Sequence, residues 1–494
     1  MKIAIVVKIL DHERLQCILL LEKQIKEGRP SPPPITVFYS SALTAAIPDA
    51  KTFSTVRIAT DFRFLGPEDK ALSHAVLEAL KNTHFDHAIF IDAPELAHYS
   101  VMCKRIGRGL HNTKLTAIND NADFRFEALG IAEHLTQLTR VEMANTCQHA
   151  DLTLDKSTLG QEEFASNLIR ETPVPSVKQE PHSTDGTKPL VSVCIVHHNR
   201  HEYLPGLLEC FESQTYDNFE IILVDDGSDR ADSIAYLKAQ QKKFDEKNWQ
   251  IIKQDNKYLG AARNTAASAA RGKYLVFSDD DNYPQDNELE AFVSAMELSG
   301  ADIVTCGANL FFGSEITSRP KFQEFYAVPY GDLPQSAFFE NVFGDANCCV
   351  RVSTYKTLGG FTEDYGIGYE DWEFFLKASM HGYKILVIPE ILFWYRIHPS
   401  SMVNVTDATK NRQRVLRNIF DVNDYPAVLQ MANNEFIKLN TRSTPLNLPL
   451  LGGLLQFIQS PYKSHLIKRF LYSARHFGIR QALKRLNYYG KSNL

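Results

Sequence analysis

Residues 273–285 read KYLVFSDDDNYPQ and place three consecutive carboxylates directly after an apolar run. The apolar residues 274–277 are typical of a buried strand, whereas Asp279, Asp280 and Asp281 repel one another. An acidic triplet followed by asparagine and proline can be a solvated turn. It can also be a site for a hard cation, because Mg²⁺ and Mn²⁺ prefer carboxylate oxygens. In an extended segment alternate side chains share a face, so Asp279 and Asp281 could reach the same ion.

The length and composition of the chain bound the possible classes of protein. At 494 residues, two or three domains are expected. The chain is 44% hydrophobic and 23% charged, as in soluble globular proteins, and its net charge of −6 argues against a general nucleic-acid binder. Its eight cysteines form no C-x-x-C pair, which favours a reducing cytoplasm over a secreted disulfide scaffold. No run reaches about 18 apolar residues, and the N-terminus lacks a signal-peptide pattern, so no transmembrane helix is predicted.

Residues 1–170 alternate strand-like runs with helical segments, which predicts a parallel sheet with helices on both faces. The expected strands are KIAIVV, ITVFYS, HAIFIDA and KLTAIND, and the expected helices lie in LLLEKQIKE, KALSHAVLEALKN and YSVMCKRIGRGL. No G-x-G-x-x-G follows the first strand, so a dinucleotide site has no support. We therefore predict a Rossmann-like accessory domain without catalysis of its own.

Two further regions differ from the rest in composition. Residues 171–189 are rich in proline, serine, threonine and charge, and predict a linker. Residues 406–494 are helical in pattern, and no acidic residue follows Glu435. This tail is either a helical subdomain packed on the core or an amphipathic anchor that binds an anionic membrane surface. The second alternative would place the protein on the inner face of the cell membrane.

Residues 190–405 form another α/β region, whose expected strands are LVSVCIV, FEIILVDD, WQIIKQD and KYLVFSDDD. Each strand ends in polar residues. In an open parallel sheet, ligands bind beyond the carboxyl ends of the strands. Because the carboxylates of VDD and SDDD both fall at such ends, this spacing favours a binding site over two unrelated turns.

The motifs of this region resemble those of family 2 glycosyltransferases with the GT-A fold, over roughly residues 189–402. VSVCIVHHNRHEYLPGLLECFESQTYDNFEIILVDDGSDR is similar to the first half of that family, and DNKYLGAARNTAASAARGKYLVFSDDD to its Asn, Gly, Ala-Arg-Asn and D-x-D segment. The segment TRVEMANTCQHADLTLDKST resembles, more distantly, the end of the first lobe of two-lobed (GT-B) glycosyltransferases. The expected fold class is α/β, with a GT-A catalytic domain after a smaller Rossmann-like domain.

The resemblance implies a UDP-sugar donor, and the residue types suit one. Asp225 or Asp226 can accept the imide N–H of uracil, and Arg263 can offset diphosphate charge. Asp279 and Asp281 would hold Mn²⁺ or Mg²⁺. The implied nucleotide-binding residues are His197, His198, Asn199, Arg200, Asp225, Asp226, Asn256, Gly260, Arg263, Asp279 and Asp280. Gly260 would permit close backbone approach. This sequence departs from the family at Val196-His197-His198-Asn199, where the usual motif is Pro-Thr-Tyr-Asn.

FGDANCCVRVSTYKTLGGFTEDYGIGYEDWEFFLKASMHGYKIL resembles the acceptor half of the family. The implied contacts with donor sugar or acceptor are Asp345, Asn347, Gly360 and Trp372. Glu370 and Asp371 are the implied catalytic pair, with Asp371 as general base, although one carboxylate at a helix start can simply cap it. The motif FWYRIHPSS implies His398 as a third metal ligand.

Together these features predict a metal-dependent, inverting glycosyltransferase that moves a sugar from a UDP donor to a glycan or lipid-linked acceptor in surface polysaccharide synthesis. The alternatives are a sugar-nucleotide pyrophosphorylase and a catalytically degenerate scaffold. The pyrophosphorylase would need a glycine-rich phosphate loop, which VSVCIVHHNR does not supply. The sequence names neither the sugar, nor the linkage, nor the acceptor.

Overall fold

The structure is a computed structural model of the 494-residue chain. It describes three stretches, residues 1–119, 149–156 and 187–417, with internal gaps at 11, 27–32, 43–52, 62, 67, 314–316, 322–324, 332–336, 339 and 398–405. Most of the expected linker and nearly all of the expected basic tail therefore lie outside the described residues.

The N-terminal unit, which we define as residues 1–119 and 149–156, contains a six-stranded parallel sheet in the order β3-β2-β1-β4-β5-β6. This is the strand order of a Rossmann-type sheet. The strands are β1 (Ile3–Leu10), β2 (Ile35–Ala42), β3 (Ser54–Arg57), β4 (His87–Ile91), β5 (Lys114–Asn119) and β6 (Leu152–Asp155). The helices are α1 (His12–Lys26), α2 (Glu68–Asn82) and α3 (His98–Arg105), with the short 3₁₀ helix η1 (Pro94–Ala97) between α2 and α3.

Helices cover both faces of this sheet, as the sequence predicted. Ile5 and Val7 of β1 pack with α1, whereas Ala4 and Val6 pack with α2. This alternation is the two-residue period of a strand that is buried on both sides. The expected parallel α/β architecture of the N-terminal unit is thus confirmed. Its likeness to a GT-B lobe remains a prediction.

The second sheet has nine strands in the order β11-β15-β12-β14-β10-β7-β8-β9, with β13 paired to β12. Its strands are β7 (Val191–His197), β8 (Phe219–Asp226), β9 (Gln250–Gln254), β10 (Tyr274–Asp279), β11 (Tyr283–Pro284), β12 (Ile303–Phe312), β13 (Phe325–Ala327), β14 (Cys349–Arg351) and β15 (Ile385–Ile397). The helices are α6 (Leu204–Glu212), α7 (Ala231–Glu246), α8 (Leu259–Ala269), α9 (Glu288–Ser299), α11 (Val352–Leu358), α12 (Glu370–Met380) and α14 (Ala408–Leu416).

Strands β10, β7, β8 and β9 are parallel, and β14 runs antiparallel between β10 and β12. The sheet is therefore mixed, as expected for a GT-A domain. The register aligns His197 with Asp225 and Val196 with Asp279, so the carboxyl ends of β7, β8 and β10 lie at one level. The two acidic strand ends thus meet at one edge, as the sequence predicted.

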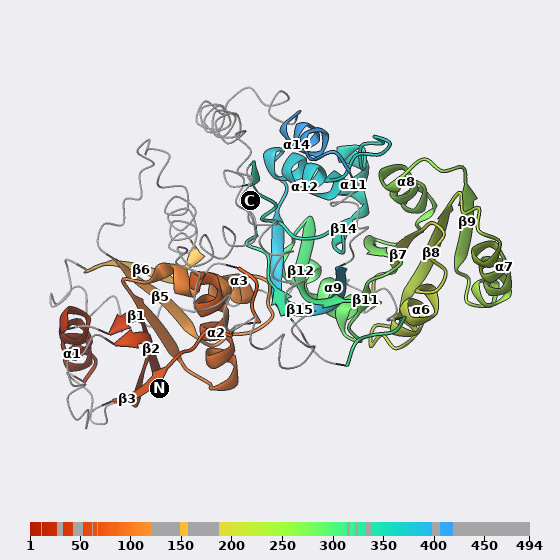
Figure 1. The fold of residues 1–494 in the computed structure, drawn as a ribbon. Helices are drawn as coiled ribbons and strands as arrows, with labels where there is room; N and C mark the ends of the chain where they lie inside the picture. Colours follow the sequence, from red (N-terminus) through yellow and green to blue (C-terminus); the bar gives the residue numbers. More distant parts are fainter. Residues whose placement is uncertain are drawn as a thin grey trace, which may run out of the picture.

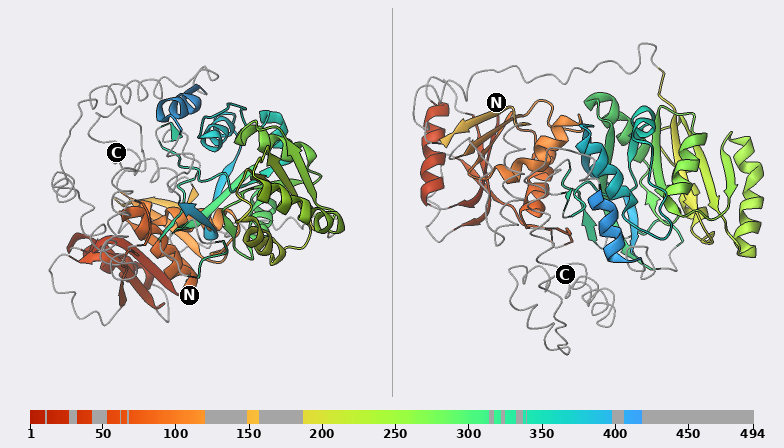
Figure 2. Two further views of the ribbon diagram at one scale, coloured as in Figure 1. Left: turned by 45° about the vertical axis from the view of Figure 1, so that its right-hand side comes forward. Right: turned by 90° about the horizontal axis from the view of Figure 1, so that it is seen from above.

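Two apolar layers hold this sheet in place. Val193 and Ile195 of β7 pack with α6 and α9 on one face, whereas Cys194 and Val196 pack with α8, α11 and α12 on the other. The N-terminal unit lies beside this assembly, and α3 lies next to β15 (Figure 1). Figure 2 shows the same two sheets side by side in two further views.

The last described element, α14, begins inside the region expected to be helical, with Asp407 capping its first turn through the main-chain nitrogens of Thr409 and Lys410. It packs on α12, and its Arg414 is buried beside Glu373. Packing against the helices of the second sheet therefore continues beyond residue 405. Among the described helices, none is both long and apolar enough to cross a membrane.

Candidate active site

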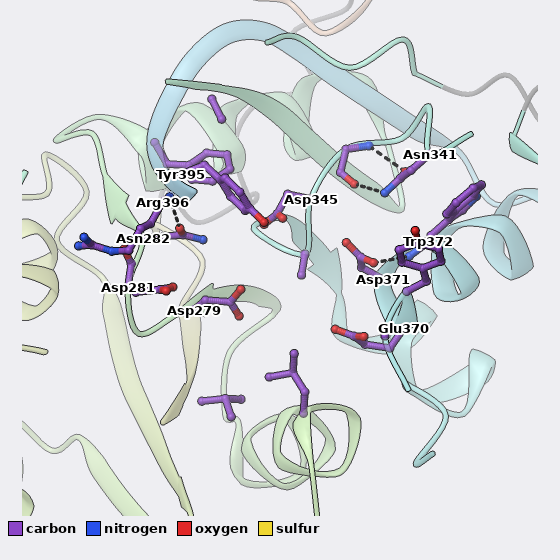
Figure 3. Close-up of a pocket in the computed structure, with 18 of the residues that line it drawn as sticks. Asp279, Asp281, Asn282, Asn341, Asp345, Glu370, Asp371, Trp372, Tyr395 and Arg396 are labelled. Carbon is purple, nitrogen blue, oxygen red and sulfur yellow. Dashed lines mark hydrogen bonds between the residues drawn. The ribbon is translucent and has the colours of Figure 1, made fainter. Parts of the chain in front are cut away.

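A cavity of about 870 Å³ opens beyond the carboxyl ends of β7, β8 and β10. It brings together residues of the acidic triplet and of the Glu370-Asp371-Trp372 motif (Figure 3). The expected site residues that line it are His198, Arg200, Asp226, Asn256, Arg263, Asp279, Asp281, Asp345, Glu370, Asp371 and Trp372. Other expected residues lie outside its lining: His197, Asn199, Asp225, Gly260, Asp280, Asn347 and Gly360. His398 falls outside the described residues.

The acidic triplet alternates as an extended segment should. Asp279 and Asp281 line the cavity, whereas Asp280 is fully buried beneath it. Asp280 pairs with His197, whose Nδ1 lies 2.8 Å from its carboxylate, and with Arg200. Arg200 also donates to Asp281 at 2.8 Å and lines the cavity, so Asp280 and its partner His197 hold the Arg200 guanidinium in the cavity wall. Their expected part in nucleotide binding would then be indirect, through Arg200.

Carboxylates are crowded in this cavity. Burial, together with the nearby charges of Asp280 and Asp279, raises the pKa of Asp281 to about 6, although the charge of Arg200 opposes this shift. Burial also raises the pKa of Asp345 well above its usual range, and the charges of Asp279 and Asp371 add to this effect. An excess of buried negative charge favours protonation or a bound cation.

At the nucleotide side, the two aspartates that end β8 have separate partners. Asp226 accepts from the main-chain nitrogens of Lys257 and Tyr258, both at 2.9 Å, and from Gln254 at 2.7 Å. Asp225 accepts from the main-chain nitrogen of Ser228 and lies behind the cavity. Of the two uracil acceptors that the sequence left open, Asp226 is therefore the one that a ligand can reach.

The remaining expected residues of this side shape loops. Asn199 has a φ of +57° and accepts from the main-chain nitrogens of Asp229 and Arg230, which joins the β7 and β8 loops. A Cβ on Gly260 would lie 2.6 Å from the carbonyl oxygen of Thr362. The close approach at Gly260 is thus made by the loop that precedes α12.

Arg263 bridges the two acidic motifs. Its side chain is 1% exposed, and its guanidinium donates to Asp279 at 2.7 Å and to Glu370 at 2.5 Å. Its charge is therefore matched by two carboxylates in this structure. The expected contact of Arg263 with a diphosphate stays a prediction, since it would have to share the guanidinium with these partners.

Glu370 and Asp371 begin α12 but have different surroundings. Glu370 pairs with Arg263 and lies 3.7 Å from Arg414. Asp371 accepts from the main-chain nitrogen of Trp372 at 2.7 Å, and it forms no ion pair with any cation in the described part of the chain. Burial and the charge of Glu370 raise the pKa of Asp371 to about 7, with Arg263 opposing them. Asp371 is therefore the better candidate for proton transfer near neutral pH.

The helix-cap alternative accounts for little of this arrangement. The residue that precedes α12, Tyr369, has a φ of +65° and makes no side-chain cap hydrogen bond. The carboxylate of Asp371 accepts only the adjacent main-chain N–H among the contacts of the described residues. A local contact of this kind leaves the rest of the carboxylate facing the cavity (Figure 3).

Residues expected to contact the sugar or acceptor divide into two groups. Asp345 and Trp372 line the cavity, and the indole of Trp372 donates to the carbonyl of Ala337 at 2.6 Å. Asn347 lies beneath it and donates to Glu288 at 2.8 Å. Gly360 has a φ of +72°, and a Cβ there would lie 2.5 Å from the side-chain oxygen of Asn264, so it serves a tight turn.

The structure adds cavity residues that the sequence reasoning did not select. Tyr395 and Arg396 belong to the same motif as His398 but were not singled out. The main-chain nitrogen of Arg396 donates to Asn282, and its side chain donates to the carbonyl oxygen of Asp281, which ties β15 to the acidic turn. Asn341 and Tyr330 also line the cavity, from a stretch without a recognisable motif. Within the described ranges, no group of three or more His, Cys, Asp and Glu side chains is arranged as a metal site.

The comparisons with known proteins agree with this geometry. Residues 192–355 match the model of "Glycosyl transferase family 2", and residues 274–478 match "Glycosyl transferase family group 2". EpsH of Bacillus subtilis is 28% identical over 227 residues, which cover 44% of this chain and 63% of EpsH. The glycosyltransferase AglE of Haloferax volcanii is 27% identical over 217 residues, 43% of this chain and 69% of AglE. The chain thus spans somewhat under two thirds of EpsH.

Solved structures that match include Staphylococcus aureus TarS in complex with UDP-GlcNAc, at 18% identity and a TM-score of 0.39, covering 62% of this chain and 92% of that one. Another is the mannosyltransferase PcManGT of Pyrobaculum calidifontis with GDP-Man and Mn²⁺, at 15% identity and a TM-score of 0.38, covering 62% and 81%. At such scores these likenesses add nothing to the assignment, which rests on the sheet topology and the family model. The part of this chain that carries the acidic triplet, residues 192–355, belongs to glycosyl transferase family 2, as its motifs predicted.

Proposed function

We propose that this protein is a metal-dependent, inverting glycosyltransferase that moves a sugar from a UDP donor to a hydroxyl of a glycan or lipid-linked acceptor in surface polysaccharide synthesis. The observation that carries the proposal is the convergence of Asp279, Asp281 and Asp371 on one cavity at the carboxyl ends of parallel strands. A relative, TuaG of Bacillus subtilis, supports the class of product. Its name refers to teichuronic acid biosynthesis, and it is 32% identical over 103 residues, 21% of this chain and 40% of TuaG.

The donor would lie across the ends of β7, β8 and β10. In this proposal Asp226 and His198 meet the base and Arg200 meets the diphosphate; the proposal is supported by the position of all three in the cavity lining. Arg200 is about half exposed on its side chain, so it can turn towards a phosphate without leaving the wall. This arrangement follows the general rule for ligand sites in open α/β sheets.

The carboxylates fit a divalent cation by their chemistry. Asp279 and Asp281 offer the oxygen ligands that Mn²⁺ and Mg²⁺ prefer. Burial and the charges of Asp280 and Asp279 raise the pKa of Asp281 to about 6, and a divalent cation would favour its ionised form. When bound, such an ion supplies positive charge that stabilises a departing nucleoside diphosphate. Asp279 and Asp281 are the residues that would hold it, and His398 remains the proposed third ligand.

Asp371 is the proposed general base. Its carboxylate would take the proton of an acceptor hydroxyl while that oxygen forms a bond to the anomeric carbon and the bond from this carbon to the diphosphate oxygen breaks. A single displacement inverts the anomeric centre. A base is most effective when its pKa lies near the working pH, and the pKa of Asp371, raised to about 7, meets this condition.

The experiment is an assay of UDP release from a panel of UDP-sugars, with Mn²⁺ or Mg²⁺ and candidate acceptors. A transferase releases UDP in proportion to glycosylated acceptor. A pyrophosphorylase would instead form UTP when pyrophosphate is supplied. A scaffold would bind UDP but would release none from any of the UDP-sugars, and that outcome would overturn the proposal.

A further inference from the structure

One wall of the cavity is a short segment, residues 325–331, that comprises β13 and the turn after it. Val328, Pro329 and Tyr330 line the cavity. The other side of this segment lies against the N-terminal unit, because Phe64, Tyr99 and Met102 form one apolar cluster with Tyr326 and Val328. The wall is therefore held between the cavity and residues of the N-terminal unit that lie more than 200 positions earlier in the chain.

Main-chain hydrogen bonds extend the second sheet across this boundary. The main-chain nitrogen of Leu65 donates to the carbonyl of Tyr326 at 2.7 Å, and the nitrogen of Tyr326 donates to the carbonyl of Arg63 at 2.9 Å. Phe64 and Tyr326 thereby form a parallel β-bridge. Residues 63–65 act as one further piece of strand beside β13, which fixes its position along the sheet.

The start of α3 makes two more hydrogen bonds to the wall. The hydroxyl of Tyr99 donates to the carbonyl of Val328 at 2.8 Å, and Nε2 of His98 donates to the carbonyl of Tyr330 at 2.8 Å. Both side chains are buried, and both belong to the first turn of α3. Burial also lowers the pKa of His98 to about 3, so the ring is neutral at physiological pH and donates one proton in a fixed direction.

These hydrogen bonds pair main-chain carbonyl groups that would be costly to bury without a partner. The carbonyls of Val328 and Tyr330 lie at the buried boundary, where an unpaired carbonyl loses its hydration without a replacement. Packing is also close, since a Cβ on Gly331, at a φ of +102°, would lie 2.9 Å from the terminal carbon of Met102. The conformation of the wall therefore depends on α3 as well as on the second sheet.

We infer that the N-terminal unit positions the transferase cavity, with Tyr99 and His98 as positioning residues that hold the wall at Val328–Tyr330. This inference rests on the proposed function. The wall belongs to the half of the sheet that carries β12 and β13, whereas His198 and Asp226, proposed to meet the base, lie at the ends of β7 and β8. The N-terminal unit thus acts on the sugar and acceptor side of the cavity and leaves nucleotide binding alone.

The test uses the full chain with Tyr99→Phe, His98→Phe and the double variant. The matched control is Thr113→Val, which also removes a buried hydroxyl that donates to a main-chain carbonyl, that of Phe85 at 2.7 Å, but lies wholly within the N-terminal unit. Each positioning variant is expected to lower kcat/KM for the acceptor by about three- to tenfold, as for one lost hydrogen bond, with the double variant lower still. The Kd for UDP should stay within about twofold of the wild-type value, and the control should match the wild type in both.

Amide hydrogen exchange gives a readout that does not depend on activity. Peptides covering residues 325–331 should exchange faster in Tyr99→Phe and His98→Phe than in the wild type or Thr113→Val. If the wild type transfers no sugar, the proposed function fails, and exchange at the wall still decides the inference. Unchanged exchange and unchanged acceptor kinetics in the double variant, or an equal effect of Thr113→Val, would overturn it.

Discussion

Replacing Asp371 with asparagine tests the proposed base most directly. The substitution keeps the shape of the side chain and an oxygen that can accept the main-chain N–H of Trp372, but removes the basic group. We expect kcat to fall by about 10²- to 10⁴-fold, the usual loss for a general base. The Kd for UDP should hardly change, since Asp371 lies at the start of α12, away from the ends of β7 and β8.

The pH dependence of wild-type activity provides a second quantitative test of Asp371 as the base. A base must be ionised to work, so activity falls as pH drops below the pKa of the folded protein. With the pKa of Asp371 raised to about 7, about half of the molecules are active at pH 7. About one in a hundred is active at pH 5, because each pH unit below the pKa lowers the ionised fraction about tenfold. Plots of kcat/KM against pH between 5 and 9, at constant ionic strength, should show this acid limb in the wild type.

The matched control for this prediction is Glu363→Gln. Glu363 is a carboxylate in the loop before α12 that accepts from Asn264 at 2.8 Å at the surface and does not line the cavity. Its replacement should leave turnover and the acid limb unchanged. The assignment of Asp371 is refuted if Asp371→Asn keeps more than about a tenth of the activity, or if it loses UDP binding while turnover persists.

Three other predictions concern the metal, a buried carboxyl group and the tail. Asp281→Ala should abolish transfer without unfolding the chain, and EDTA should mimic this loss until Mn²⁺ or Mg²⁺ is added back; full activity in excess chelator would contradict the D-x-D assignment. Because burial raises the pKa of Glu288 to about 8, the contribution of this group to wild-type stability is greatest below about pH 4.5 and falls as pH rises towards 8, by at most about 1.4 kcal/mol per pH unit. Between pH 4.5 and 8, melting curves should therefore show the stability of the wild type falling relative to that of Glu288→Gln. Parallel pH profiles for the two proteins would show that Glu288 is not protonated in the fold. The full chain should float with anionic liposomes more than with neutral ones, whereas a chain that ends near residue 449 should not float yet should still transfer sugar; equal flotation of both would make the tail a packing element.

Much of the fold could be predicted because its signals are local. The apolar runs of β1, β4, β7 and β10 are each bounded by polar residues, and that pattern needs no knowledge of distant contacts. The alternation within the acidic triplet was predictable for the same reason, since it follows from the two-residue period of a strand. The structure confirms the parallel strands and the common edge on which their acidic ends meet.

What could not be predicted depends on residues far apart in the sequence. Strand β14 is only three residues long, Cys349–Arg351, and owes its place to antiparallel pairing with both β10 and β12. The docking of α3 against residues 325–331 joins two side chains to main-chain carbonyls about 230 positions away and leaves no periodic signal. Gly260 and Gly360 belong to recognisable motifs, but only the tertiary structure shows that Gly260 packs against Thr362 and Gly360 against Asn264.

Arg263 shows why the two acidic motifs need one another. A guanidinium that is 1% exposed is expensive to bury, and a single carboxylate would seldom repay its lost hydration. Here Asp279 from the donor half and Glu370 from the acceptor half share it, and their charges help to raise the pKa of Arg263. Because both partners are needed, the pairing fixes the start of α12 against the end of β10. Asp371, the next residue after Glu370, is thereby held at the cavity that Asp279 also lines, without an ion pair of its own among the described residues. Its pKa can then rise towards neutrality, which is the condition for a general base at working pH.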